Sequence, residues 1–184
     1  CYKIPDGKGP CVNVQSELTA YNFAGDYTAW FYNGENHNIG PEKLTETDGT
    51  RLPVMTVKAG DKHYMAIHEA CLETGAPLVL QSKGGESLFS VASKPTSLSP
   101  GYTSAWRVVL YGTTPGVLTD SHLLELLNPD PDSRYDFSWV KPGLAVWDWR
   151  INGAVWDGFT YGMSYPSWVR MVDFAAEQGF KYLV

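Results

Sequence analysis

Short runs of β-branched and aromatic residues, separated by polar turns, make up the first hundred or so residues of the chain. Turn pairs such as Asp48-Gly49 and Gly84-Gly85 divide these runs, a pattern typical of antiparallel strands with tight connections. We therefore predict an antiparallel β-sandwich over residues 1–112. The expected strands cover 21–32, 52–57, 63–72, 78–81, 87–92 and 106–111.

The pattern changes after this block. Apolar residues in 116–127 recur at the spacing of a short amphipathic helix, and a stretch rich in Pro and Asp follows it, so we predict a helical linker over 113–140. Residues 144–149 then predict a strand, and 180–184 predict another. Between these strands, Ser164 as N-cap and Gly179 as the stop residue predict a helix.

Strand, helix and strand within residues 141–184 form a βαβ unit, whose two strands should be parallel and buried. Two parallel strands make neither a closed barrel nor a complete doubly wound sheet. We therefore expect the chain to be a fragment of a longer protein. Cys1, which stands where an initiator Met would be, leads to the same expectation.

The composition narrows the classes of partner. The formal net charge is -6 and no Lys/Arg cluster occurs, which disfavours nucleic acid. No apolar run approaches the ~20 residues that a membrane-spanning helix needs. Aromatic residues make up 14% of the chain, and they serve either as core or as flat faces for sugars, peptides or bases.

The oxidation state of the three cysteines has two possible interpretations. Cys1 and Cys11 close a short disulfide loop in an oxidising compartment, or all three cysteines, Cys71 included, are unpaired thiols. The chain has no CxxC pair and no metal-type spacing. The cysteines therefore predict neither a disulfide framework nor a zinc site.

Glu69 occupies an apolar position within the predicted strand 63–72. Because alternate residues share one face of a strand, Glu69 lies beside Met65 and Ile67. A carboxylate there must be hydrogen-bonded, paired or metal-bound, because leaving it bare costs about 2–7 kcal/mol or more. We predict mainly a structural carboxylate, with a direct role in a site as the alternative.

Residues 30–42 place five polar side chains, four of which carry oxygen, in one expected loop after an aromatic strand. These residues are Glu35, Asn36, His37, Asn38 and Glu42. Oxygen ligands on a flexible loop suit a hard cation such as Ca²⁺. The alternative is a polar loop that only faces solvent.

The triplet Trp147-Asp148-Trp149 is the sharpest local feature of the sequence. On the predicted strand 144–149, both Trp side chains project to one side and Asp148 to the other. The indoles either stack on a sugar ring or fill the interior of the sheet. Asp148 or Arg150 could hydrogen-bond the hydroxyls of such a sugar.

Five strings in a fixed order carry a family resemblance. They are SAWRVV (104–109), Asn128-Pro129, SWVKPG (138–143), Trp147-Asp148-Trp149 and VDFAAEQGF (172–180). Together they resemble glycoside hydrolase family 97, which includes α-glucosidases and α-galactosidases. The resemblance extends from about Tyr64 to the C-terminus and is thin before Trp30.

The resemblance implies an N-terminal β-super-sandwich followed by a (β/α)₈ barrel that acts on terminal α-linked sugars. It also implies Ca²⁺ at the active site, with Glu35 as the ligand from the sandwich and Glu42 as its rival. Trp147, Asp148, Trp149 and Arg150 then face the sugar. The family often has a Trp-Trp pair where this chain has Trp149-Arg150, which bears on substrate preference.

Glycoside hydrolysis uses two carboxylates that flank the scissile bond. The resemblance places both on later barrel strands, so we assign no catalytic residue to this chain and expect it to be inactive alone. We expect the full-length protein to be secreted or periplasmic. The alternative function is that of a non-catalytic carbohydrate-binding sandwich.

Overall fold

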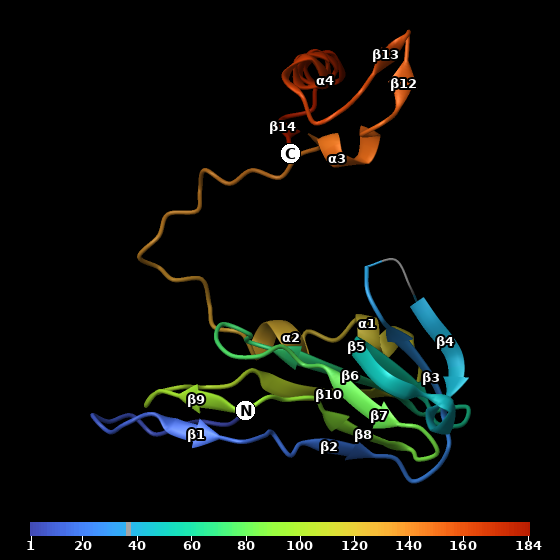
Figure 1. Cartoon of the computed structure of the whole chain (residues 1–184), viewed down its shortest axis with the longest axis vertical. Coiled ribbons are helices and arrows are strands. Elements are labelled where there is room, and N and C mark those ends of the chain that lie inside the picture. Colours follow the sequence, from blue (N-terminus) through green and yellow to red (C-terminus); the bar gives the residue numbers. More distant parts are fainter. Residues whose placement is uncertain (36–37) are drawn as a thin grey trace. The chain divides into compact units, whose positions relative to one another are not determined.

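The computed structural model describes residues 1–35 and 38–184, and these divide into two units, Cys1–Asp130 and Pro131–Val184. The first unit is built mainly from antiparallel strands and the second from a short parallel pair with helices (Figure 1). No helix in the described residues is long and apolar enough to cross a membrane. Each unit is described on its own below.

An eight-stranded sheet dominates the first unit, with the order β10-β6-β5-β7-β8-β2 and with β3 joining β4 to β5. All pairings in it are antiparallel. Its strands are β2 (Ala20–Asn22), β3 (Thr28–Tyr32), β4 (Asn38–Lys43), β5 (Asp48–Lys58), β6 (Tyr64–Ala70), β7 (Leu80–Lys83), β8 (Leu88–Val91) and β10 (Trp106–Gly112). A separate pair joins β1 (Val12–Val14) to β9 (Thr96–Leu98).

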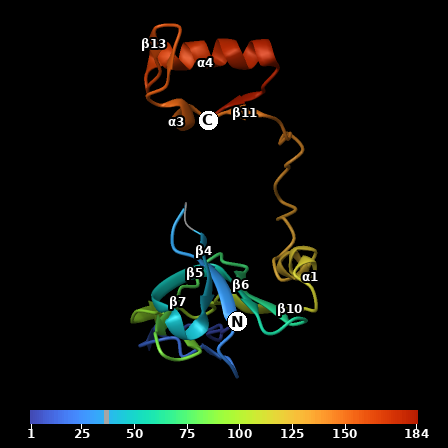
Figure 2. The ribbon, with the colours of Figure 1, turned by 90° about the vertical axis from the view of Figure 1, so that its right-hand side faces the viewer.

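Strand β5 belongs to two layers because it changes its neighbour partway along. Its first residues, Asp48 to Arg51, pair with β7, whereas Met55 to Lys58 pair with β6. A strand that passes from one layer to the other closes a sandwich at its corner. Figure 2 shows the same unit turned by 90°.

The main core of this unit is apolar and lies among β3, β5, β6, β7 and β8. Its buried residues are Ala29, Phe31, Leu44, Met55, Val57, Ile67, Leu78, Leu80, Phe89 and Val91. Phe31 and Phe89 pack with ring centroids 5.7 Å apart. The sandwich that the sequence predicts is confirmed in its antiparallel strands and in this core.

Two short helices cover the other face of β6 and β10. These are α1 (Gly116–Thr119) and α2 (Leu123–Leu126), and Leu118, Leu124 and Leu127 pack against Ala66, Ala70, Val108 and Leu110. The prediction of one helix over 116–127 is therefore wrong. Thr119 donates its hydroxyl proton to the carbonyl of Gly116, and the Ser121 hydroxyl oxygen accepts the N–H of Leu123, so local side-chain bonds replace a helical turn.

Two further expectations for the first unit need correction. Residues 21–32 form two strands rather than one, with a bend at Ala24 and Gly25 between β2 and β3. Residues 38–42 are not loop, because they lie in β4 and pair with β3. Strands β1 and β9 were not predicted, and each is only three residues long.

The second unit contains the predicted βαβ unit. Its elements are β11 (Ala145–Val146), α3 (Asp148–Ile151), β12 (Val155–Trp156), β13 (Phe159–Thr160), α4 (Tyr165–Gln178) and β14 (Tyr182–Leu183). Strands β11 and β14 are parallel, as predicted, but they are not buried as predicted, because each has one exposed and one partly exposed residue. Helix α4 begins after Ser164, has a Pro in its first turn and ends at Gly179, whose φ of 72° suits a residue without a side chain.

Leu80 and Leu18 provide a matched test of where the first unit draws its stability. Leu80 is 0% exposed within the core and Leu18 is 88% exposed. We expect Leu80→Ala to lower the free energy of unfolding by about 3 kcal/mol, because it leaves a cavity. Leu18→Ala should change it by less than about 0.5 kcal/mol. Urea unfolding of both variants measures the difference, and equal losses would contradict this core.

Candidate functional site

A cluster of partly buried charges in the first unit surrounds Arg107 on β10. Its guanidinium donates to both carboxylate oxygens of Glu17, at 2.9 and 2.7 Å, and to Oε2 of Glu69 at 2.9 Å. The three side chains are 10%, 17% and 11% exposed, in the order Arg107, Glu17 and Glu69. One cation is thus held between two anions at the edge of the core.

Strand register explains this cluster. Arg107 lies directly opposite Glu69 in the pairing of β10 with β6, so their side chains share a face. Oε2 of Glu69 also accepts the N–H of Leu78 at 2.8 Å. The prediction that Glu69 is a satisfied structural carboxylate is confirmed.

The pKa values in the cluster follow from burial and from these bonds. Burial alone would raise the pKa of Glu17, but hydrogen bonds from Arg107 and Thr19 and the Arg107 charge outweigh it, so the pKa is lowered. The hydrogen bond to Glu17 raises the pKa of Arg107. Burial raises the pKa of the nearby Tyr21 hydroxyl. Near neutral pH, Glu17 therefore stays ionised, Arg107 stays protonated and Tyr21 stays neutral. These charge states suit a cluster that stabilises the fold.

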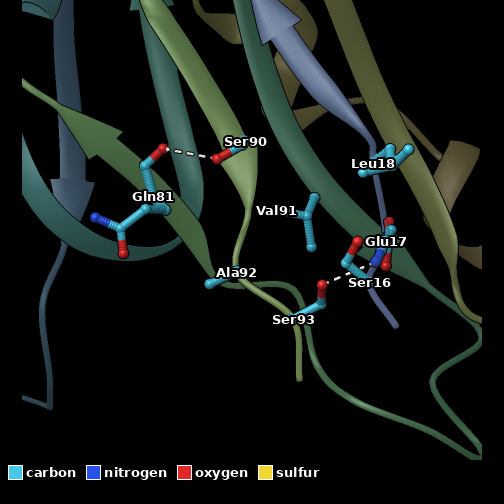
Figure 3. Close-up of a pocket in the computed structure, with 8 residues that line it drawn as sticks. All are labelled: Ser16, Glu17, Leu18, Gln81, Ser90, Val91, Ala92 and Ser93. Carbon is cyan, nitrogen blue, oxygen red and sulfur yellow. Dashed lines mark hydrogen bonds between the residues drawn. The ribbon is translucent and has the colours of Figure 1, made fainter. Parts of the chain in front are cut away.

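A shallow groove of about 470 Å³ lies beside this cluster (Figure 3). Its walls are Ser16, Glu17, Leu18, Gln81, Ser90, Val91, Ala92 and Ser93. Much of its polar lining is already bonded within the protein: Ser93 accepts the N–H of Glu17 at 2.8 Å, and the Glu17 carboxylate is paired with Arg107. We therefore assign no ligand to this groove.

Glu35, the predicted calcium ligand, is an exposed residue in the turn between β3 and β4. Asn36 and His37 lie outside the described residues. In the described part of the chain, no group of three or more His, Cys, Asp or Glu side chains is placed to hold a metal ion. Since Ca²⁺ takes six to eight oxygen ligands, Glu35 can supply only part of a site.

Glu42, its rival, has other partners. Its Oε1 accepts a hydrogen bond from the buried Thr47 hydroxyl at 2.6 Å and lies 3.7 Å from the Arg51 guanidinium. Because β4 carries Glu42 away from the turn, Glu35 and Glu42 do not share one loop. That part of the sequence prediction is wrong.

The Trp147-Asp148-Trp149 segment is not a strand. Strand β11 ends at Val146, Trp147 is the N-cap of α3, and the N–H of Arg150 bonds to the Trp147 carbonyl at 3.2 Å. The predicted alternation of the two Trp side chains with Asp148 is therefore wrong. An acidic residue in the first turn of a helix favours this conformation over an extended one.

The side chains of α3 take three different environments. Oδ2 of Asp148 accepts the indole N–H of Trp168 on α4 at 2.9 Å. The Arg150 guanidinium lies 5.5 Å from the centroid of the Trp147 ring, a cation–π contact. Trp149 is well exposed. Asp148 thus fixes α3 to α4, while Trp149 and Arg150 face outward.

Two contacts that fix Arg107 and Asp148 cannot be predicted from the sequence around either residue. The Arg107–Glu17 pair joins residues 90 positions apart, and Trp168 reaches Asp148 across 20 positions. An apolar run holding one Arg, such as 104–111, is the only hint that a carboxylate must lie nearby. Of the two readings for the cysteines, the structure has unpaired thiols at Cys1, Cys11 and Cys71.

Comparison with known proteins assigns most of the chain to one family. Residues 1–129 match the family model described as Glycosyl-hydrolase 97 N-terminal. A retaining alpha-galactosidase of Bacteroides thetaiotaomicron is 28% identical over 188 residues, which cover 87% of this chain and 28% of that protein. A probable retaining alpha-galactosidase of Streptomyces bingchenggensis is 28% identical, and the match covers 100% of this chain and 28% of that protein.

Solved structures agree with these relatives. A glycoside hydrolase family 97 enzyme from Pseudoalteromonas sp. strain K8, in complex with acarbose, superposes with a TM-score of 0.78 at 26% identity. A single-residue variant of a family 97 enzyme from the same strain has the same TM-score and identity. Each match covers 99% of this chain and 30% of the other. The chain spans less than a third of the length of these proteins.

Removing Arg107 should cost stability and change its pH dependence. Arg107→Gln leaves two partly buried carboxylates without their cation, so we expect a loss of about 2 kcal/mol in the free energy of unfolding at pH 7. The lowered pKa of Glu17 stabilises the wild type above the ordinary value of 4.5, and this contribution is lost as the pH falls through the lowered pKa. In the variant, the hydrogen bond and the charge of Arg107 no longer oppose the effect of burial on Glu17, so this stabilising contribution is reduced.

The difference between wild type and Arg107→Gln should therefore shrink as the pH falls below the ordinary Glu17 pKa of 4.5 and through the lowered pKa. Urea unfolding at several pH values measures it. Arg134→Gln is the control, because the Arg134–Asp132 pair is exposed and should contribute little. A difference that stays constant with pH would contradict the proposed role of the cluster.

Proposed function

Because the chain belongs to glycoside hydrolase family 97 through its N-terminal domain, we propose that it works as part of an enzyme that hydrolyses terminal α-linked galactosides with retention of configuration. The observation that carries this proposal is the match of 87% and 100% of the chain to the two retaining alpha-galactosidases. The acarbose complex of a similar enzyme supports α-glucosides as the alternative substrate class.

We propose that the two units have different tasks in this enzyme. The sandwich, with its core and its Arg107 cluster, is a rigid support. The second unit is the first βαβ part of a (β/α)₈ barrel, in which β11 and β14 are neighbouring strands. In such barrels the connections at the carboxyl ends of the strands build the active site.

Residues 147–150 follow the carboxyl end of β11 and so would face the sugar. We propose that Trp149 lies against the apolar face of the terminal sugar and that Arg150, oriented by the Trp147 ring, donates to its hydroxyls. Asp148 acts as a positioning residue, since its carboxylate already binds Trp168. The carboxylate thus holds α3 in place and is not the group that reacts.

The reaction itself needs two further carboxylates. In a retaining enzyme these are about 5–5.5 Å apart, one acting as nucleophile and the other as acid and then base. Glu17 and Glu69 are both bonded to Arg107, and Asp148 is bound to Trp168, so none of them suits either role. We propose that the pair comes from a part of the enzyme outside these residues, in a secreted or periplasmic protein.

Hydrolysis assays test the proposal on the full-length protein that carries this sequence. We expect a clearly higher kcat/KM for nitrophenyl α-galactoside than for the α-glucoside. Proton NMR of the first product should detect α-galactose, because retention preserves the anomer. β-Galactose as the first product would contradict retention. A higher kcat/KM for the α-glucoside would contradict the α-galactoside proposal and favour α-glucosides as the substrate class.

Calcium is the second part of the proposal, with Glu35 as one ligand. A bound Ca²⁺ would orient and polarise sugar or water in the cleft. We expect a chelator to abolish activity, and Glu35→Gln to raise the Ca²⁺ concentration for half-maximal activity by about tenfold or more, since a carboxylate ligand is lost. Glu86→Gln, at an exposed glutamate in the turn between β7 and β8, is the matched control. Full activity in chelator would remove calcium from the proposal.

A further inference from the structure

A small hairpin projects from the connection between α3 and α4. Strands β12 and β13 pair antiparallel, with Trp156 opposite Phe159, around the turn Asp157-Gly158. Both turn residues have positive φ, 49° and 68°, as the tightest hairpin turns require. The N–H of Tyr161 also bonds to the Ala154 carbonyl at 2.8 Å, which extends the pairing.

The hairpin is fixed to α4 through Phe159. The Arg170 guanidinium lies over the Phe159 ring, 4.1 Å from its centroid. Phe159 in turn packs edge-on against Tyr161, with centroids 5.1 Å apart. These contacts hold β13 on the second turn of α4, so the hairpin has a defined position in its unit.

Trp156 takes no part in that packing and is 74% exposed. Phe159, its partner across the hairpin, is partly buried. An indole carries a large apolar surface, and exposing it on a rigid hairpin gains nothing for folding. Asp157, also exposed, adds a hydrogen-bonding group at the same tip.

The hairpin also lies in the connection that follows the carboxyl end of β11. It belongs to the segment that runs from the carboxyl end of β11 to the start of α4, the same segment that carries Trp149. Ligands of parallel α/β units bind at the carboxyl ends of the strands. Residues in this connection therefore lie on the side where a substrate is expected.

We propose that Trp156 binds the sugar unit on the leaving-group side of the scissile bond, as an aromatic platform at the rim of the site. The inference rests on the proposed α-glycosidase function and deepens it by naming a residue for the second sugar. Trp156 is more exposed than Trp149, the residue proposed for the terminal sugar, at 74% against 61%, which suits the rim of the site. The apolar face of a pyranose ring matches an indole in size and flatness.

The test compares a substrate with a sugar leaving group and one without. In the full-length protein, we expect Trp156→Ala to raise KM for an α-galactosyl trisaccharide about tenfold, which corresponds to about 1.4 kcal/mol of binding. Its kcat should change little, and hydrolysis of α-galactosyl fluoride should be unaffected, because fluoride cannot contact the indole. Trp156→Phe should restore most of the affinity for the trisaccharide.

Trp139→Ala is the matched control, since Trp139 is similarly exposed but precedes β11. An unchanged KM for the trisaccharide in an active Trp156→Ala enzyme would overturn the inference alone. Equal losses on both substrates, with a lower Tm, would also overturn it, because Trp156 would then pack against another part of the enzyme. A wild-type protein that hydrolyses neither substrate would refute the proposed function itself.

Discussion

Strand β5 pairs with β7 along its first residues and with β6 along its last, and this division makes the sandwich possible. Because one strand serves both layers, the layers cannot separate without breaking the sheet. The buried side chains of Met55 and Val57 on β5 then meet Phe31 and Phe89 in the core. At the edge of that core, Arg107 on β10 bonds to Glu69 on β6 and to Glu17 in the segment before β2. These bonds join the three segments.

The charged cluster of the sandwich stabilises the fold, because Arg107 bonds both of its partly buried carboxylates. The second unit differs, because several of its aromatic residues are exposed and its parallel strands are short. Exposed aromatic side chains in a connection at the carboxyl end of a strand are typical of a ligand-binding face. In the proposed enzyme, the first unit acts as support and supplies Glu35 to the calcium site, and the second unit offers the aromatic groups that could meet a substrate.

Much of the fold could be predicted from the sequence where local pattern and tertiary packing agree. The β-branched run Val108-Val109 forms a strand in both, and helix α4 has the expected N-cap and glycine stop. The predictions failed where contacts other than the alternation of apolar and polar residues decide the structure. Asp148 enters a helical turn and binds Trp168, and Glu42 pairs with Thr47 and Arg51 on a strand rather than standing in a loop. Neither set of partners is visible in the local pattern.

The most direct test is a crystal structure of the full-length protein with galactose bound. The account predicts the sugar at the carboxyl end of β11, with the Trp149 ring against its apolar face and Asp148 still bonded to Trp168. Galactose held instead in the groove between Ser16 and Ser93, or at the opposite ends of β11 and β14, would contradict it.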